Sequence, residues 1–477
     1  MIEGVSAPEM VTLKGVTALK TFADFYGDPV GCVEKMYACH GPVIALNAPL
    51  LKPSGVPQSY LFVGPEFNKK ILLNQEHFRP TGAWPTPGKE GTPLQNLRRN
   101  ILCMRGAEHD AHLAAILPLT GKSQVRSFFD GAKAITAEEV SAWPIGETVE
   151  ITHLARRLTQ RLALELLFGS DSADESLEFG ELVDEFHQNS WSRGALSFRV
   201  DAPLTPYAKL MRSAEALETY AKEWTAAEQR CPAHNNVRAA AANVALANGE
   251  TVSLTQAAAN VAAIAMAAYE TTALTLSWML FLLTQHPEAT KALIAELEGA
   301  GSLSSLDADG IEKLPLLDGA VKETMRLVTP VPVIGFEVME DCKIDDIALH
   351  RGARIFISPH LTHRLESVYE HPRRFMPERW ASIKPSAYEY LPFNAGPRRC
   401  PGIWFASANL KIALATIVER FRFDLAPNTK IDRGYAATTI AKNGVPMIFS
   451  PRDACYERSA CAGDIMRFFD LSETVHA

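Results

Sequence analysis

The stretch Phe393-Asn-Ala-Gly-Pro-Arg-Arg-Cys-Pro-Gly402 places one cysteine in a loop of glycine, proline and arginine, directly before an apolar segment that is compatible with a helix. Gly396 and Gly402 let the backbone turn tightly and approach a flat ligand closely. Positive charge from Arg398 and its neighbour, together with the start of the following helix, is expected to favour the Cys400 thiolate. The loop therefore predicts a thiolate held beside a flat ligand, and the alternative is an ordinary buried thiol.

The composition indicates a globular protein with a large core. Hydrophobic residues make up 47% and charged residues 21% of the 477-residue chain, which is ordinary for such proteins. The formal net charge of -8 argues against a nucleic-acid partner, because phosphate binding needs a basic surface. The eight cysteines are scattered without Cys-x-x-Cys pairs, which favours a reducing, cytoplasmic location. No linker divides the chain, so one large domain is expected.

Two segments bear on membrane attachment. Residues 1–30 carry acidic and basic side chains throughout, so neither a signal peptide nor a membrane anchor is expected there. The apolar stretch from Val261 to Thr284 is long enough to cross a bilayer, but Glu270 near its middle would cost about 3 kcal/mol in lipid. We expect instead one long central helix from residue 252 to residue 285.

Short extended runs near the two ends of the chain predict a small amount of sheet. Residues 42–46 and 59–63 are expected to pair as a hairpin. Residues 353–358 and 446–450 are expected to form two further strands. The rest of the chain is expected to be rich in helix.

The cysteine loop resembles the heme-binding loop of the cytochrome P-450 superfamily, and the resemblance extends over roughly residues 20–452. It implies a mainly α fold with a small β-rich lobe, in which heme lies between the long central helix and the helix after the cysteine loop. The lobe would combine the N-terminal part, residues 327–360 and the C-terminal hairpin. The resemblance also implies one domain over residues 1–452, an accessory tail over residues 453–477, and a soluble protein of the bacterial type.

The same resemblance assigns the cofactor and its ligands. It implies heme b, with Cys400 as the axial ligand of the iron and Arg398 as the partner of a propionate. Phe393 is expected to pack beside the sulfur. The other implied cofactor-binding residues are Gly396, Gly402, His109 and Ala267.

Within the long helix, Ala267-Ala-Tyr-Glu-Thr-Thr272 resembles the family's oxygen-activation motif. Splitting dioxygen consumes two protons, and a hydroxyl beside a carboxylate can control their delivery. The resemblance therefore implies catalytic roles for Thr271, as the hydrogen-bonding group, and Glu270, as the proton relay. The alternative is that Thr271 only bonds back to the carbonyl of Ala267. Ala268 replaces a glycine that is usual in the family.

An acid and a base lie three residues apart at Glu323 and Arg326, and a second arginine, Arg379, follows further along the chain. On its own, such a pair is a common feature of helix surfaces. The resemblance implies instead that these residues form a buried structural triad, which fixes the segment leading into the cysteine loop.

Two positions depart from the family pattern around the heme propionates. Leu113 stands four residues after His109, where an arginine is usual, and Glu337 or Phe336 stands where another is common. Other basic groups must then meet the two negative charges, or the deficit is tolerated. The candidates are Arg99, Arg105, His109, His112, His363 and Arg364.

The function implied by the resemblance is that of an oxidoreductase, a heme-thiolate monooxygenase. Such an enzyme uses O2, two electrons and two protons to hydroxylate or otherwise oxidise a hydrophobic organic molecule. The electrons are expected from a separate ferredoxin or flavodoxin with its NAD(P)H reductase, docking near Arg373, Arg374, Arg398 and Arg399. The residues expected to line the substrate pocket are Ala263, Ala267, Val331, Val333 and Thr439.

The residues leave two other functions open. One is a peroxide-dependent or isomerising heme-thiolate enzyme, which would not need the pair Glu270 and Thr271. The other is a non-catalytic heme sensor or carrier, which the unusual propionate region keeps open.

Overall fold

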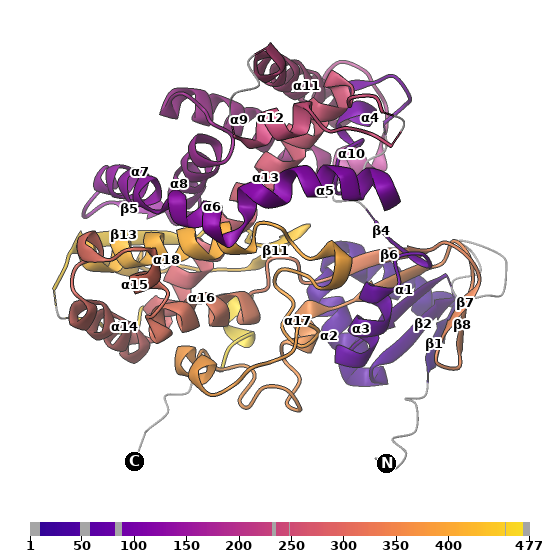
Figure 1. Cartoon of the computed structure of the whole chain (residues 1–477). Helices are drawn as coiled ribbons and strands as arrows, with labels where there is room; N and C mark the ends of the chain where they lie inside the picture. Colours follow the sequence, from indigo (N-terminus) through magenta and orange to yellow (C-terminus); the bar gives the residue numbers. More distant parts are fainter. Residues whose placement is uncertain are drawn as a thin grey trace.

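The long apolar segment forms helix α13, Leu254–Gln285, which passes through the middle of the molecule (Figure 1). The side chain of Ser253 caps it by accepting a hydrogen bond from the backbone N–H of Gln256 at 3.3 Å, and the helix ends directly before His286. The predicted central helix is therefore confirmed. The computed structural model describes residues 10–47, 58–81, 88–230, 235–247, 249–453 and 455–470.

Within these residues, α13 is the one helix that is long and apolar enough to cross a membrane. However, 83% of its most apolar window is buried inside the protein. A helix that is apolar on all sides and covered by other elements is a core helix. Trp278 and Phe281, for example, are buried among residues of the surrounding helices.

Helices from both halves of the chain pack on α13. They are α4 (Pro93–Leu97), α8 (Ile151–Leu166), α9 (Ala173–Ser190), α11 (Pro206–Arg230), α12 (Val237–Ala242), α14 (Pro287–Ala300), α16 (Pro315–Leu327) and α18 (Ile403–Arg420). The other helices are α1 (Gly15–Gly27), α2 (Pro29–His40), α3 (Pro65–Leu73), α5 (Gly106–Thr120), α6 (Lys122–Ser127), α7 (Phe129–Ser141), α10 (Arg193–Ser197), α15 (Ala308–Ile311) and α17 (Pro359–Thr362). Short 3-10 helices are η1 (Leu303–Ser305), η2 (Pro377–Ala381), η3 (Gly396–Arg398) and η4 (Asp464–Arg467).

A six-stranded sheet lies beside the helices, at the right of Figure 1. Its strands, in spatial order, are β1 (Val11–Lys14), β2 (Val43–Asn47), β3 (Ser59–Phe62), β9 (Arg354–Ile357), β6 (Ile334–Val338) and β4 (Phe78–Pro80). β2 and β3 are antiparallel neighbours, which confirms the predicted hairpin, and β9 confirms the strand predicted near residue 355. The hairpin of β7 (Cys342–Ile344) and β8 (Ile347–Leu349) packs on this lobe.

The C-terminal strands do not join this sheet, so the expected make-up of the β-rich lobe is wrong in this part. β13 (Pro446–Pro451) pairs with β10 (Phe421–Leu425) and β5 (Thr148–Glu150), and β11 (Arg433–Ala436) pairs with β12 (Thr438–Ala441). The rings of Phe449 and Phe421 lie 5.1 and 6.5 Å from that of Trp143. Burial of these aromatic groups against α7 and its neighbours keeps the strands on the helical part.

The chain after β13 packs against the rest of the fold, and the accessory role expected for this tail stays a prediction. Ile465, Phe468 and Phe469 are only 1%, 6% and 6% exposed and belong to the main core. The backbone N–H of Ser459 donates to a carbonyl at the end of α13 at 3.0 Å. Residue 454 and residues 471–477 of that tail lie outside the described residues.

Candidate active site

Cys400 lies at the end of a closed loop, three residues before the first residue of α18 and directly after η3 and Arg399. Its backbone N–H donates to the carbonyl of Phe393 at 2.8 Å. Gly396 has a φ of +67°, and a Cβ there would lie 2.9 Å from the carbonyl oxygen of Leu72 in α3. Any larger residue would therefore be strained and would clash with α3.

Gly402 is not required for the turn. Its φ of -79° is ordinary for any residue, and an added Cβ would meet only the sulfur of Cys400, at 3.7 Å. The prediction that both glycines permit a tight turn therefore holds for Gly396 and is wrong for Gly402. The backbone N–H of Gly402 hydrogen-bonds the sulfur, a contact that any residue except proline could make.

The surroundings of Cys400 do not by themselves favour a thiolate. Burial raises the pKa of the Cys400 thiol above its ordinary value, and the Gly402 N–H and the charge of Arg399 oppose that rise without outweighing it. The Cys400 thiolate therefore stays a prediction for the ligand-bound site. A bound metal cation deprotonates a thiol that coordinates it, so ligation itself would make the thiolate.

Arg398 is held by two other segments of the chain. Its Nη2 donates to the carbonyl of Met104 at 2.6 Å, and its Nε donates to Oε1 of Gln75 at 3.2 Å. The side-chain nitrogen of Gln75 is buried and has no partner among the described residues. A buried donor without an acceptor is costly, so this place suits an anionic group that the chain does not supply.

Two further arginines lie near Cys103, as Arg398 does. Burial raises the pKa of Cys103, whereas three positive charges lower it. These charges belong to Arg98, Arg398 and Arg79. The side chain of His109 is buried. This burial lowers the pKa of His109, and the charge of Arg398 lowers it further. Sequence reasoning missed Arg79 and Arg98, because no local pattern connects β4 or the segment before α5 to the cysteine loop.

The two departures from the family pattern have clear roles. Leu113 packs against the buried side chains of Ile101 and Met104, so this position makes an apolar contact. Glu337 in β6 forms an ion pair with Arg79, its cross-strand neighbour in β4. The carboxylate at position 337 therefore binds one of the arginines that lie near Cys103.

Most of the other basic candidates serve the fold. His363 accepts a hydrogen bond from the backbone N–H of Leu391 at 2.8 Å, and Arg364 donates to the carbonyl of Leu327 at 2.6 Å. Nδ1 of His112 lies 3.0 Å from an amide of α13. These bonds give the three residues structural roles. Exposed side chains are found at Arg99 and Arg105.

Between residues 257 and 285, helix α13 is accessible along one stripe only, at Ile264, Ala267, Ala268 and Thr271. Residues three and four apart share one face of a helix, so the stripe borders an open space. Ala263 is fully buried and does not line that space as expected. Ile264 packs against the cluster that contains Met104, whose carbonyl binds Arg398.

Thr271 and Glu270 point to different sides of α13. The hydroxyl of Thr271 donates to the carbonyl of Ala267 at 3.1 Å, which is the local bond that the sequence left open. The carboxylate of Glu270 is 8% exposed and accepts two hydrogen bonds from Arg156 in α8, at 2.8 and 3.0 Å. The structure therefore places the hydroxyl on the accessible stripe and the carboxylate in a buried ion pair.

A second acid completes this ion pair. Asp184 in α9 lies 3.5 Å from Nε of Arg156 and accepts a hydrogen bond from the Tyr269 hydroxyl at 2.7 Å. Burial, and next to it the charge of Glu270, raise the pKa of Asp184 to about 6, although Arg156 lowers it. Sequence reasoning missed Arg156 and Asp184, because they come from helices far from residue 270 in the chain.

Glu323, Arg326 and Arg379 meet in one buried network. Nη2 and Nε of Arg326 donate to the two carboxylate oxygens of Glu323 at 2.8 and 2.9 Å, and Nε of Arg379 donates to the same carboxylate at 2.9 Å. The indole N–H of Trp380 adds a fourth bond at 3.0 Å. Glu323 and Arg326 are fully buried, so they are not the surface pair that the sequence alone left open.

The residues expected after the triad to line a substrate pocket differ in accessibility. Val331 is 37% exposed. Val333 is buried with Val33 and other residues of the β-rich lobe, and its place in the pocket wall stays a prediction. The Thr439 hydroxyl donates to a backbone carbonyl at 3.3 Å and is buried, so its polar group is already engaged.

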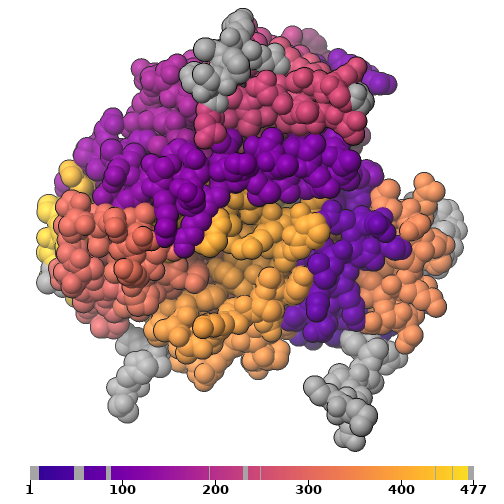
Figure 2. Space-filling model, viewed as in Figure 1, coloured from indigo at the N-terminus to yellow at the C-terminus, as the bar shows by residue number. Residues whose placement is uncertain are grey.

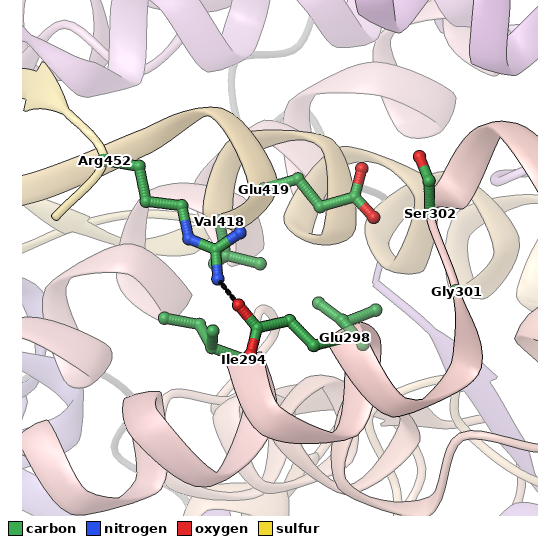
Figure 3. Close-up of a pocket in the computed structure, with 8 residues that line it drawn as sticks. Ile294, Glu298, Gly301, Ser302, Val418, Glu419 and Arg452 are labelled. Carbon is green, nitrogen blue, oxygen red and sulfur yellow. Dashed lines mark hydrogen bonds and ion pairs between the residues drawn. The ribbon is translucent and has the colours of Figure 1, made fainter. Parts of the chain in front are cut away.

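A separate cavity of about 380 Å³ lies between α14 and the C-terminal end of α18. Figure 3 shows Ile294, Glu298 and Val418 in its wall, with an ion pair between Glu298 and Arg452. Cys400 precedes the opposite end of α18, and a helix of 18 residues is about 27 Å long. This cavity is therefore distinct from the cysteine site.

The cysteine loop also reaches the surface. In Figure 2 the segment around residue 400 occupies the middle of the face in view, below α5 and α6 and beside α3. Arg399 is exposed there, and Trp404 is 41% exposed with Nζ of Lys122 5.3 Å from its ring centre. This face offers positive charge and an aromatic ring close to the cysteine.

Comparisons with known proteins agree with this architecture. The family model described as Cytochrome P450 matches residues 55–447. The structure of retinoic acid bound cyanobacterial CYP120A1 has the same fold, with a TM-score of 0.79, 20% sequence identity and coverage of 94% of this chain and 100% of that chain. At this identity the likeness shows the fold alone.

Two relatives illustrate the range of sequence similarity. Cytochrome P450 139 of Mycobacterium tuberculosis is 24% identical over 399 residues, which are 82% of this chain and 90% of that protein. Cytochrome P450 4d1 of Drosophila melanogaster is 30% identical over 195 residues, or 39% of this chain. The chain spans 38% of the length of the Drosophila protein in that match.

Proposed function

Because the chain belongs to the cytochrome P450 family, we propose that it is a heme-thiolate monooxygenase that oxidises a hydrophobic organic substrate with O2, two electrons and two protons. One observation carries the proposal: the cysteine loop and the accessible stripe of α13 meet through one set of contacts. Ile264 of the stripe packs on the cluster of Met104, and the carbonyl of Met104 binds Arg398, two residues before Cys400.

The residues present fit a heme. Cys400 supplies the sulfur ligand, and the stripe of small side chains at Ala267 and Ala268 leaves space along α13. The unpartnered, buried side-chain nitrogen of Gln75 and the partly buried guanidinium of Arg398 would bind a propionate, because both present donors in one place. Arg98, His109 and Arg79 add positive or polar groups nearby. We propose heme b as the form bound.

When bound, a cysteinate-ligated heme supplies oxygen activation, since electron density from the thiolate favours cleavage of the O–O bond. The chain's own residues would supply protons. Thr271 carries a hydroxyl proton on Oγ1 at the accessible stripe, and this hydroxyl donates a hydrogen bond to the carbonyl of Ala267. Glu270 is held through both carboxylate oxygens in the ion pair with Arg156, so it could relay a proton to that stripe only after it leaves this pair and takes up a proton from solvent. Arg156 would therefore control the supply.

The substrate is proposed to be hydrophobic. The accessible residues of α13 between 257 and 285 are two alanines, one isoleucine and one threonine, and Val331 presents a further apolar side chain. Apolar walls with few polar groups select by shape and burial of apolar surface. The Thr271 hydroxyl is the polar group on the stripe.

The electron donor is proposed to be a separate ferredoxin or flavodoxin with its NAD(P)H reductase. Of the arginines expected at the docking face, Arg398 is held inside by Gln75 and Met104, whereas Arg399 is exposed. We therefore place docking at Arg399, Trp404 and Lys122. Arg399→Glu should slow reduction of the iron without changing substrate affinity. With scattered cysteines, a reducing, cytoplasmic location is part of the proposal.

The absorption spectrum of the dithionite-reduced protein under carbon monoxide tests the proposal, in the parent and in Cys400→Ser. The parent is expected to show the long-wavelength band of a thiolate-ligated heme, and the variant to lose it. A pigment-free parent, or a band that persists in Cys400→Ser, would contradict the assignment of Cys400. Tight heme binding without reduction by any donor would favour a heme sensor or carrier instead.

A further inference from the structure

We propose that residues 455–470, here called the C-terminal strap, position the cysteine ligand by holding the turn at residues 370–374 from outside. The inference rests on the proposed role of Cys400 as heme ligand. The strap lies beyond residue 447, where the match to the family model ends. Its contacts reach from the end of α13 to the turn at residues 370–374, which the buried triad also contacts.

The first half of the strap is anchored to the helical core. Ser459 donates its backbone N–H to the carbonyl of Thr284 at 3.0 Å and accepts from the side chain of Gln285 at 3.0 Å. Ala462 exchanges two backbone hydrogen bonds with residues 429–431, at 3.0 and 2.9 Å. These bonds therefore fix the position of the chain at Ser459 and Ala462, before the second half of the strap begins.

The second half ends in two buried phenyl rings. The ring of Phe469 lies 6.1 Å from that of Phe281 in α13. The ring of Phe468 packs on the guanidinium groups of Arg433 and Arg364 and lies 5.8 Å from the His360 ring. Aromatic groups bury large areas and dominate local packing energy. These rings fix the end of the strap at the side of the turn.

Directly after the rings, the strap bonds to the turn. The backbone N–H of Asp470 donates to the carbonyl of Arg373 at 2.9 Å, and Nη1 of Arg373 donates to the carbonyl of Arg467 at 3.0 Å. Nε of Arg374 donates to the carboxylate of Asp470 at 3.1 Å. Three bonds therefore hold the outer side of the turn.

The triad holds the inner side of the same turn. Arg326 donates to the carbonyls of Pro372 and Arg374 at 2.7 and 3.0 Å, and Arg379 donates to the carbonyl of His371 at 3.2 Å. His371 has a φ of +46°, which is strained for a residue other than glycine. Such strain persists only where the surroundings hold the backbone firmly. The turn keeps this conformation because triad and strap hold it from both sides.

The turn is connected to Cys400 through hydrogen bonds. Nδ1 of His363 lies 3.2 Å from the carbonyl of Arg326, and Nε2 of the same ring accepts from the backbone N–H of Leu391 at 2.8 Å. Two residues later, the carbonyl of Phe393 accepts from the N–H of Cys400. Loosening the strap should therefore weaken the position of the Cys400 sulfur before the helical core unfolds.

Two full-length variants test the proposal. Asp470→Asn removes the charge from the bond to Arg374 while keeping the shape, and Phe468→Ala removes an anchoring ring. The matched control is Asp453→Asn, since Asp453 is exposed to 44%, as Asp470 is to 43%, but pairs with Arg422 of β10. Its carboxylate also accepts from the backbone N–H of Cys455 at 3.0 Å, and asparagine keeps an oxygen for that bond. None of these residues touches the proposed heme site. The measurement follows the thiolate band itself, so it needs no substrate.

The protein is reduced, bound to carbon monoxide and kept at a moderate temperature. Two rates are then measured on the same sample: the loss of the thiolate absorption band and the loss of helical circular dichroism. Asp470→Asn should speed the loss of the band about three- to fivefold, the factor expected from an exposed ion pair, ahead of any loss of helix. Phe468→Ala should speed it more, and Asp453→Asn should match the parent.

The outcomes separate the two proposals. If the parent lacks the thiolate band, the proposed function fails and the strap inference falls with it. If the parent shows the band but both strap variants match it, or if band and helix decay together by the same factor, only the strap inference is overturned. Should Phe468→Ala fail to fold, Asp470→Asn decides, because its side chain is partly exposed and the change is conservative.

Discussion

The guanidinium of Arg156 binds both carboxylate oxygens of Glu270, with Nε and Nη2 at 2.8 and 3.0 Å. This pair joins α8 to the central helix at the residue that follows the buried Tyr269. The side chains of Arg156 and Glu270 are 19% and 8% exposed, so water hydrates neither charge well. Each charge is therefore compensated mainly by the other. The pair is thus a structural element and, in the proposed function, a control on proton supply.

Removing only the arginine should be costly. Arg156→Met leaves the carboxylate of Glu270 buried without its partner, which should lower the free energy of unfolding in urea by about 3 to 5 kcal/mol. The double variant Arg156→Met with Glu270→Gln should recover much of the loss. Arg126→Ala serves as control, because its pair with Asp309 is 47% and 56% exposed and should change stability by about 0.5 kcal/mol or less. If Arg156→Met and Arg126→Ala lowered the free energy of unfolding equally, burial of the ion pair would not be what makes it important.

Asp184 should make stability depend on pH. Its folded-state pKa is raised to about 6, so the folded protein holds this proton more tightly than the unfolded chain. The associated stability is present below about pH 4 and is lost as the pH rises through about 6. Asp184→Asn should therefore match the parent at low pH and exceed it by up to about 3 kcal/mol at pH 7. Urea unfolding at several pH values checks this, and a constant difference across the range would refute it.

The two glycines of the cysteine loop should respond differently to alanine. Gly396→Ala meets a φ of +67° and a carbonyl oxygen at 2.9 Å, and should lower the free energy of unfolding by about 1 to 3 kcal/mol. Gly402→Ala has an ordinary backbone conformation and no close contact, and should stay close to the parent. Thermal unfolding and heme content of the two variants decide the point; similar behaviour of both would show that the loop relaxes.

Arg398→Ala should weaken heme binding. The variant removes a partly buried donor beside Gln75, and a hydrogen bond to a charged group contributes about 1.5 to 3 kcal/mol. Heme transfer to an excess of a heme-free acceptor protein should be about ten- to a hundredfold faster than in the parent. Arg99→Ala, an exposed arginine from the candidate set, is the control. Unchanged retention in Arg398→Ala would show that another residue binds the propionate.

Several features could be predicted from the sequence because they depend on neighbouring residues. A Gly/Pro-shaped loop before an apolar helix, a 32-residue apolar helix with Ser253 at its start, and the hairpin of β2 and β3 follow from local patterns. The resemblance brought Glu323, Arg326 and Arg379 together before the structure showed their contacts.

Other features depended on side chains meeting across long stretches of chain. No local pattern indicates that Arg79 pairs with Glu337, or that Arg156 and Asp184 meet Glu270. Ala263, which was expected in the pocket wall, is fully buried instead, since one position along a helix turns a side chain from a cavity into the core.

By itself, the sequence determined the central helix, the cysteine loop and the family to which the chain belongs, because backbone preferences and motif spacing are local. The tertiary structure alone decided which charges are buried together, which face of α13 is open, and that residues 455–470 belong to the core. The physical reason is that burial and pairing depend on the full set of surrounding groups, and α8, α9 and the C-terminal strap supply those groups only after the chain has folded.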